Sequence, residues 1–257
     1  MNLEARIETY WNNRSDRFNE IRLAELHSKN AAAWQDLLQQ HLPKEQPLQI
    51  LDIGTGTGFF AILLAELGHE LTGIDRSAKM IDHARKNAAA YGLSATFLTM
   101  DAEQPDFPAQ SFDVILSRNL TWTLPDVKKA YQEWHRLLKP GGRLLNFDAN
   151  YGKACFAAPK TAHSVHQGIA TDLLDECDKI KDALTISQQS RPAWDLAALK
   201  QAGFHTPHLD PDITPRVHID PELEYDNIPL FPIYAVSVKS SGVSPPKQKG
   251  QPSLADH

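Results

Sequence analysis

Short apolar runs alternate with helix-like segments through the middle of the chain. Runs of strand length occur at 50–53, 70–74, 96–100, 112–116 and 231–238, and another begins after Gly142. Apolar residues recur at helical spacing between them, which predicts helices over 59–67, 78–91, 125–138 and 192–202. Strands that alternate with helices of these lengths predict an α/β fold, with a parallel sheet covered by helices on both faces.

Further helical segments flank this region and interrupt it. Before the first strand, apolar residues recur at helical spacing over 3–11, 15–27 and 30–41, and Pro43 ends the series. After the fifth strand, a long segment intervenes that has helical character over 162–186. We therefore expect an N-terminal helical lid at 1–45, a main domain at 46–240 with an inserted helical cap at about 149–190, and a disordered tail at 241–257.

A glycine-rich turn follows the first apolar run. Residues 50–58 read Ile-Leu-Asp-Ile-Gly-Thr-Gly-Thr-Gly, and the next helix is expected to begin at Phe59. Glycines at alternate positions let the backbone approach a ligand closely, and the start of the helix offers unpaired N–H groups. A nicotinamide-binding turn would carry glycine or alanine at position 59, where this chain has phenylalanine. The motif predicts a pocket for a nucleotide-like ligand.

Acidic residues follow the second and third apolar runs. Asp75 lies roughly twenty residues after the first glycine, the spacing at which adjacent parallel strands deliver a carboxylate to the same crevice. Such a carboxylate can accept both hydroxyls of a ribose. Alternatively, Asp75 only caps the next helix, which Ser77 can do as well. Asp101 follows the third run and is a second candidate for ligand binding. Alternatively, it is only a solvent-exposed aspartate in a turn.

In order and spacing, residues 46–148 resemble the class I S-adenosylmethionine (SAM) dependent methyltransferases. The resemblance rests on the glycine turn preceded by Asp52, on Asp75, on the pair Asp101-Ala102 and on the Leu-Lys-Pro-Gly-Gly turn at 138–142. Its general likeness is to small-molecule methylases that include quinone-biosynthesis C-methyltransferases. It implies a doubly wound, mostly parallel seven-stranded sheet whose last strand is antiparallel. It also implies methyl transfer from SAM to a small-molecule acceptor by in-line displacement.

The resemblance also implies roles for the cofactor-binding residues. Asp52 would lie near the methionine portion of SAM, Asp75 would bind the ribose, and Asp101 with Ala102 would bind the adenine. The segment 117–122 would line the space beside the sulfonium. The residues expected to contact the cofactor are Asp52, Gly54, Thr55, Gly56, Asp75, Arg76, Met80, Asp101, Ala102, Ser117 and Asn119.

Residues for the acceptor are expected from three parts of the chain. The segment 10–14, Tyr-Trp-Asn-Asn-Arg, resembles an aromatic and basic cluster that closes over the methionine end and the acceptor in many of these methylases. Alternatively, Trp11 and Phe18 simply dock this helix onto the core. The fifth strand ends at the ligand-facing edge of the sheet, where Tyr151 is a further candidate. The acceptor residues expected are Tyr10, Trp11, Arg14, Asn119, Trp122, Asp148 and Asn150.

Composition and charge narrow the class of partner. The chain of 257 residues with 42% apolar residues suits one α/β domain. Its net charge of −6, without a basic stripe, argues against DNA or RNA as substrate. No apolar run reaches membrane-spanning length and the N-terminus lacks a signal-peptide core, so a cytoplasmic location is expected. Cys155 and Cys177 suit neither a disulfide framework nor a zinc site, and His163 and His166 lack a third ligand, so no metal is predicted.

Two other functions stay open at this point. A nicotinamide-dependent oxidoreductase would also have a parallel sheet and an acidic residue after the second strand, although the glycine spacing and the Asp101-Ala102 pair oppose it. A SAM-binding regulatory or partner subunit would keep the cofactor pocket without turnover. The sequence assigns no catalytic nucleophile, acceptor atom or oligomeric state.

Overall fold

A seven-stranded sheet forms the centre of the protein in a computed structural model that describes residues 2–45, 47–157, 168–211, 213–225 and 228–237. The strand order is β3-β2-β1-β4-β5-β7-β6, and β7 runs antiparallel to both of its neighbours. The strands are β1 (Gln49–Ile53), β2 (Glu70–Asp75), β3 (Thr96–Thr99), β4 (Phe112–Arg118), β5 (Leu138–Ala149), β6 (Phe204–Leu209) and β7 (Leu230–Ser237). The expected mostly parallel sheet with an antiparallel last strand is confirmed.

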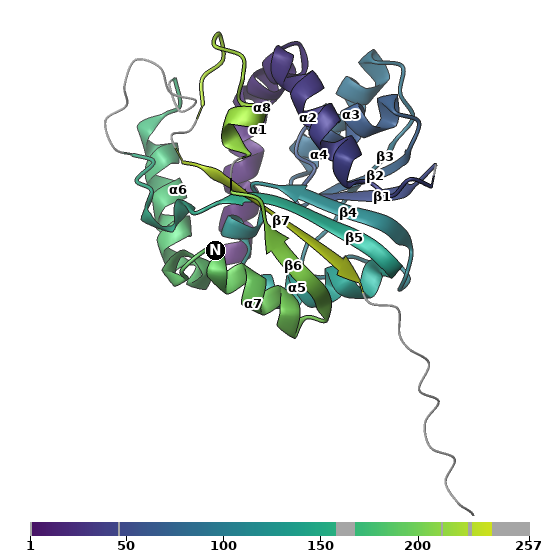
Figure 1. The fold of residues 1–257 in the computed structure, drawn as a ribbon. Helices are drawn as coiled ribbons and strands as arrows, with labels where there is room; N and C mark the ends of the chain where they lie inside the picture. Colours follow the sequence, from purple (N-terminus) through teal and green to yellow (C-terminus); the bar gives the residue numbers. More distant parts are fainter. Residues whose placement is uncertain (1, 46, 158–167, 212, 226–227, 238–257) are drawn as a thin grey trace, which may run out of the picture.

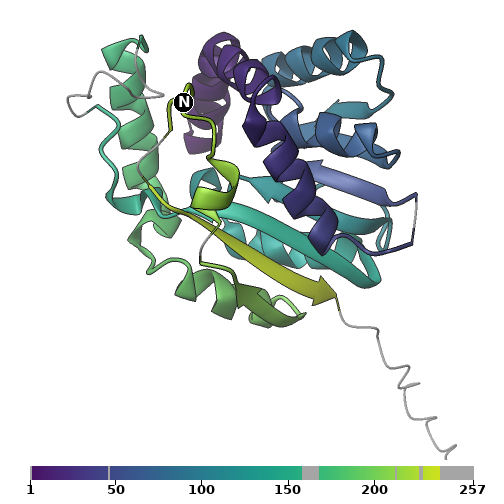
Figure 2. The same ribbon diagram turned by 45° about the horizontal axis from the view of Figure 1, so that its top comes forward.

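Helices cover both faces of the sheet (Figure 1). The helices on one face are α2 (Lys29–His41), α3 (Phe59–Glu66) and α4 (Ala78–Ala90), and those on the other are α5 (Val127–Leu137) and α7 (Ala193–Gln201). Two more helices, α1 (Leu3–Leu26) and α6 (Thr171–Ala183), contact each other beyond the ends of the parallel strands (Figure 2). The short helical turns are η1 (Thr121–Thr123), η2 (Tyr151–Lys153), η3 (Thr185–Gln188) and α8 (Thr214–Val217).

The N-terminal segment departs from the expected break between helices at 3–11 and 15–27. Residues 3–26 form one continuous helix, α1. The polar residues Asn12, Asn13 and Arg14 interrupt the apolar spacing, but neither proline nor glycine stands there to end a helix. The Ser15 hydroxyl donates to the Asn12 carbonyl at 2.9 Å, and the Asn12 side chain accepts from the Ser77 hydroxyl at 2.7 Å. The side chains of Asn12 and Ser15 are therefore hydrogen-bonded within a continuous helix.

The helix α2 belongs to the core layer although it lies within the expected lid at 1–45. Its Trp34 is fully buried and packs edge-on against Phe60 of α3 and Phe147 of β5, at centroid distances of 5.1 and 5.2 Å. Aromatic pairs at these distances contribute beyond the area that they bury. Of the expected lid, α1 alone stands over the ends of the strands.

Two further boundaries differ from the expectations. The strand β5 starts at Leu138 and not after Gly142. The Lys-Pro-Gly-Gly segment forms the first part of this strand, where the pairing with β4 is interrupted by a bulge and Gly141 has φ +83°. In the described part of the expected helical region 162–186, which begins at residue 168, α6 covers Thr171–Ala183 and the turn η3 begins at Thr185. His163 and His166, and the expected tail at 241–257, lie outside the described residues.

A buried ionic network connects β5 to α7. The Arg191 guanidinium donates to Asp195, with Nε and Oδ2 2.9 Å apart, and lies 3.3 Å from Oδ2 of Asp148. Both carboxylates are fully buried. The hydroxyl of Thr121 and the N–H of Trp122 also donate to Asp148. Burial raises the pKa of Asp148, an effect that the charge of Arg191 opposes. One guanidinium thus compensates two carboxylates, and neither can be exposed to water without opening the fold.

We expect Arg191→Met to lower the free energy of unfolding by about 3 to 5 kcal/mol, since it leaves two buried carboxylates without a counter-charge. Urea denaturation followed by circular dichroism measures the change. Arg6→Met is the control, because the Arg6–Glu176 pair is roughly one-third exposed on both sides and its loss is expected to leave the free energy of unfolding almost unchanged. Similar losses in the two variants would contradict this assignment.

Candidate functional site

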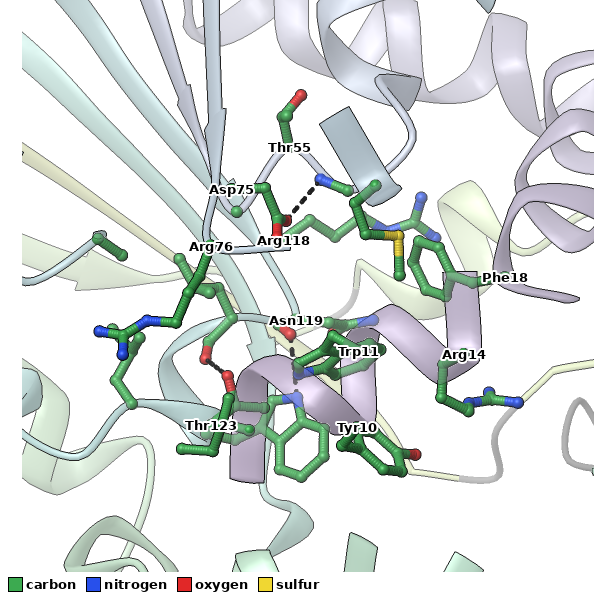
Figure 3. Close-up of a pocket in the computed structure, with 18 of the residues that line it drawn as sticks. Tyr10, Trp11, Arg14, Phe18, Thr55, Asp75, Arg76, Arg118, Asn119 and Thr123 are labelled. Carbon is green, nitrogen blue, oxygen red and sulfur yellow. Dashed lines mark hydrogen bonds between the residues drawn. The ribbon is translucent and has the colours of Figure 1, made fainter. Parts of the chain in front are cut away.

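A cavity of about 180 Å³ opens where β1, β2, β3 and β4 end, and α1 forms its opposite wall (Figure 3). In open α/β sheets this edge, beside the point at which the strand order reverses, is where ligands bind. The structure brings most of the expected site residues to this wall. Those that line the cavity are Tyr10, Trp11, Arg14, Asp52, Gly54, Thr55, Gly56, Asp75, Arg76, Met80, Asp101, Ala102, Asn119 and Trp122.

The glycine turn between β1 and α3 needs glycine at two positions. Gly54 has φ +69°, and a Cβ there would lie 2.7 Å from the Leu120 side chain. Gly56 has φ +53°, and a Cβ there would lie 3.0 Å from the Phe18 ring. Residues other than glycine rarely adopt such backbone angles. The N–H groups of residues 54 and 55 donate to the Ile74 carbonyl at 2.8 and 2.9 Å, which ties the turn to β2.

Asp75 holds the same turn from the end of β2. One carboxylate oxygen accepts from the Gly56 N–H at 3.0 Å (dashed in Figure 3), and the other accepts from the Ser77 N–H at 2.9 Å. Burial raises the pKa of Asp75 to about 6 against the effect of these two bonds. Helix α4 is capped by Ser77, whose hydroxyl accepts from the Met80 N–H at 3.2 Å. A carboxylate has about four lone-pair positions, so Asp75 retains capacity for ligand hydroxyls.

Asp52 lies beneath the turn. It is 2% exposed, and its carboxylate accepts from the Thr55 hydroxyl at 2.7 Å. Burial raises the pKa of Asp52 to about 7, and the nearby charge of Asp75 acts in the same direction. A cationic group in the cavity would favour the ionised form of this carboxylate.

The turn after β3 is held by several contacts. Asp101 forms an ion pair with Arg76 at 2.7 Å and accepts from the Glu103 N–H at 2.9 Å. The Ala102 carbonyl accepts from the Trp134 indole at 2.9 Å. These bonds keep the Asp101-Ala102 backbone at the cavity edge, although the carboxylate already has an ionic partner there.

A buried carboxylate on α1 fastens this helix to the sheet. The Arg118 guanidinium, at the end of β4, donates to both oxygens of Glu25 at 3.1 and 2.9 Å. Arg22 lies 2.6 Å from Glu25, and the Trp34 indole donates to it at 3.1 Å. Burial would raise the pKa of Glu25, but the two arginines hold it at about 2. Sequence reasoning missed this pair, because its members are 93 residues apart and leave no local pattern.

Aromatic rings line the cavity between α1 and the inserted segment. The Trp11 ring meets Phe18 at a centroid distance of 5.9 Å and Trp122 at 6.4 Å. Trp122 in turn packs against Tyr151 at 4.7 Å and Phe156 at 5.5 Å. Phe156 and the buried Cys177 of α6 line the cavity as well, and neither was among the predicted site residues.

Three expected site residues lie away from the cavity wall. The Ser117 hydroxyl donates to the Asn146 side chain on the neighbouring strand at 2.8 Å, so it points into the sheet layer. Asp148 lies in the Arg191 network described above. Asn150 lies beside the Arg191 carbonyl, with 3.5 Å between the donor and acceptor atoms. Ser117 lies within β4, whereas Asn119 follows the end of the strand and has φ +53°. Asn119 therefore departs from strand geometry and lines the cavity, while Ser117 stays beneath the surface.

Residues 50–142 match a family model described as a methyltransferase domain. A demethylmenaquinone methyltransferase from Thermus thermophilus is 39% identical over 104 residues, which make up 40% of this chain and 47% of the relative. A ubiquinone biosynthesis O-methyltransferase from Paramagnetospirillum magneticum is 32% identical over 151 residues, or 57% of this chain and 60% of the relative. The chain thus spans about half the length of these curated relatives.

A solved structure has the same fold at lower identity. It is an S-adenosylmethionine dependent methyltransferase from Mesorhizobium loti, which is 24% identical and has a TM-score of 0.55. The match covers 79% of this chain and 97% of the other.

We expect Asp52→Asn to weaken the pH dependence of stability between pH 4 and 7. The folded protein holds a proton on Asp52 up to about pH 7, whereas the unfolded chain loses it near pH 4. Asp52 therefore makes the wild type less stable as pH rises through this window, by about 1 kcal/mol for each pH unit. Urea denaturation at pH 5 and pH 7.5 measures the effect. Parallel pH profiles for the variant and the wild type would exclude a raised pKa at Asp52.

Proposed function

We propose that the chain is a class I SAM-dependent methyltransferase that binds SAM in the described cavity and transfers the methyl group to a small-molecule acceptor; the match of residues 50–142 to a methyltransferase domain and the two methyltransferase relatives support this. The Mesorhizobium loti methyltransferase that shares this fold is SAM dependent, which supports SAM as the methyl donor. The observation that carries the proposal is the convergence of Asp52, Asp75 and Asp101 around the glycine turn, at the ends of three adjacent parallel strands.

The residues at the strand ends suit the three parts of SAM. Asp75 has lone pairs left for the two ribose hydroxyls after binding Gly56 and Ser77. The Asp101-Ala102 turn would bind the adenine, since its backbone is held at the cavity edge. The glycine turn leaves room for the amino acid end of SAM, with the buried Asp52 beneath it as a counter-charge.

SAM, when bound, supplies an electrophilic methyl group on a sulfonium. The protein's contribution would be to align the acceptor with this group and to exclude water. Trp11, Phe18 and Trp122 provide an apolar wall for this purpose. Asn119 lines the cavity with φ +53°, and its side-chain oxygen is buried without a hydrogen-bond partner among the described residues. This oxygen is therefore placed to accept a hydrogen bond from the acceptor, and no dedicated base is assigned.

Three broader expectations remain proposals for this chain. They are a cytoplasmic location, an acceptor that is not a nucleic acid, and the division into a lid at 1–45 (of which α1 covers the strand ends), a main domain at 46–240 with a cap at about 149–190, and a tail at 241–257. Within the described part of the chain, no helix is both long and apolar enough to span a membrane.

Calorimetric titration with S-adenosylhomocysteine (SAH) tests cofactor binding without knowledge of the acceptor. We expect one-to-one binding in the micromolar range, roughly −8 kcal/mol, and no binding of NADH to the same preparation. Binding of NADH alone would assign the chain to nicotinamide chemistry. A screen of acceptors with methyl-labelled SAM then separates an enzyme from a SAM-binding partner subunit, which would bind SAH and transfer no label.

Asp75→Ala is expected to weaken SAH binding about tenfold or more, because it removes the acceptor for two ribose hydroxyls. Calorimetry measures the affinity and thermal unfolding checks the fold. The matched control is Asp82→Ala, which removes a carboxylate with a side chain 63% exposed on the adjacent helix α4. An unchanged SAH affinity in Asp75→Ala would remove this residue from the ribose role.

A further inference from the structure

We infer that the acceptor is an aromatic acid, held by Arg14 through its anionic group and by the aromatic wall through its ring. The inference rests on the proposed function and specifies the substrate class for the same cavity. Two independent features carry it: an arginine in the cavity wall with unsatisfied donors, and the continuous set of rings that reaches from α1 to the inserted segment.

Arg14 has donors that the protein does not use. The residue is 6% exposed and lines the cavity, and its Nε and Nη1 atoms are buried without a hydrogen-bond partner among the described residues. A buried guanidinium without a counter-charge is costly, and a carboxylate supplies both charge and paired acceptors. The site thus favours an anionic ligand at this position.

The other arginines in the cavity wall already have partners. Arg76 pairs with Asp101 at 2.7 Å, while Arg118 and Arg22 pair with Glu25 at 2.9 and 2.6 Å. Arg14 therefore differs from the other three arginines of the wall, each of which is paired with a carboxylate. An acidic ligand group entering the cavity finds an uncompensated positive charge only at Arg14 among the described arginines of this wall.

Arg14 lies on the acceptor side of the cavity. Tyr10 and Arg14 are one helical turn apart on α1, and Figure 3 shows the Tyr10 hydroxyl directed toward Arg14, with Trp11 between this pair and Asp75. Cys177 of α6 lies beside Tyr10, and its thiol interacts with the Tyr10 hydroxyl. Arg14 thus belongs to the space between α1 and the inserted segment, whereas the three cavity carboxylates lie at the ends of β1, β2 and β3.

The wall next to this space is aromatic. Trp11 reaches Trp122, and Trp122 contacts both Tyr151 and Phe156, with ring centroids between 4.7 and 6.4 Å apart. A planar ring can pack on these side chains in stacked or edge-on geometry, and such pairs contribute beyond area burial. The carboxylates at the strand ends would repel an acid, so the anionic end is directed toward Arg14 and the ring toward the methyl donor.

The test uses 2-naphthoate and 2-naphthamide, two planar probes that match in shape and differ in charge. Each is titrated calorimetrically into the wild type with and without saturating SAH. We expect naphthoate to bind at least about tenfold more tightly than naphthamide, the effect of one charge-assisted contact. Arg14→Met should abolish this preference and leave the SAH affinity unchanged, whereas Arg14→Lys should retain part of it. Arg17→Met is the control, since this exposed arginine of α1 lies outside the cavity wall and pairs with Glu20.

Two outcomes would overturn the inference. The first is equal binding of the acid and the amide by the wild type, a result that does not depend on whether the variants fold. The second is an Arg14→Met protein that loses SAH affinity while its preference for naphthoate persists, because Arg14 would then hold the cofactor. Failure of the wild type to bind SAH would count against the proposed function instead, and the titrations without SAH would still report on acid recognition.

Discussion

The buried carboxylate of Glu25 determines how the cavity is closed. It receives the Arg118 guanidinium from the end of β4, the Arg22 guanidinium from the preceding turn of α1 and the Trp34 indole from α2. The two N-terminal helices are thereby joined to the end of a strand that lies 93 residues further along the chain. Arg118 also lies over the Trp34 ring, 4.6 Å from its centroid, which gives the guanidinium an apolar support. Burying these charges is costly, and the bidentate geometry compensates the cost only when α1 lies across the strand ends.

This attachment divides the cavity into two halves of different origin. The sheet supplies the half suited to the cofactor, where parallel strands place Asp52, Asp75 and Asp101 at a common edge. The half suited to the acceptor comes from α1 and the inserted segment, and it contains Arg14 and the aromatic rings. Trp11 lies where the two halves meet. In the proposed function, the sheet edge holds the cofactor and the side chains of α1 and the inserted segment select the acceptor.

The two halves of the cavity also differ in charge: carboxylates line the half formed by the sheet, and Arg14 lines the half formed by α1 and the inserted segment. Carboxylates with raised pKa values lie at the glycine turn, where a cationic ligand would favour their ionised forms. Arg14 lies at the other end, and two of its donors, Nε and Nη1, have no partner in the part of the chain that the structure describes. An acceptor that carries a negative charge would therefore be oriented on entry, before any specific contact with the methyl donor forms. Outside the cavity wall, Arg191 forms ion pairs with Asp148 of β5 and Asp195 of α7, and this network stabilises β5.

The sequence by itself determined the features that depend on neighbouring residues: the glycine turn, the cap at Ser77, the strand and helix order, and the carboxylates that follow successive strands. These are local because strand ends, caps and tight turns require particular residues within a few positions. Only the tertiary structure decided that α1 is continuous, that Glu25 pairs with Arg118, and that Asp148 is drawn into the Arg191 network. It also decided that two donors of Arg14 lack a hydrogen-bond partner among the described residues. These outcomes depend on which side chains meet across long separations, and periodicity predicts the face of an element without predicting its partner.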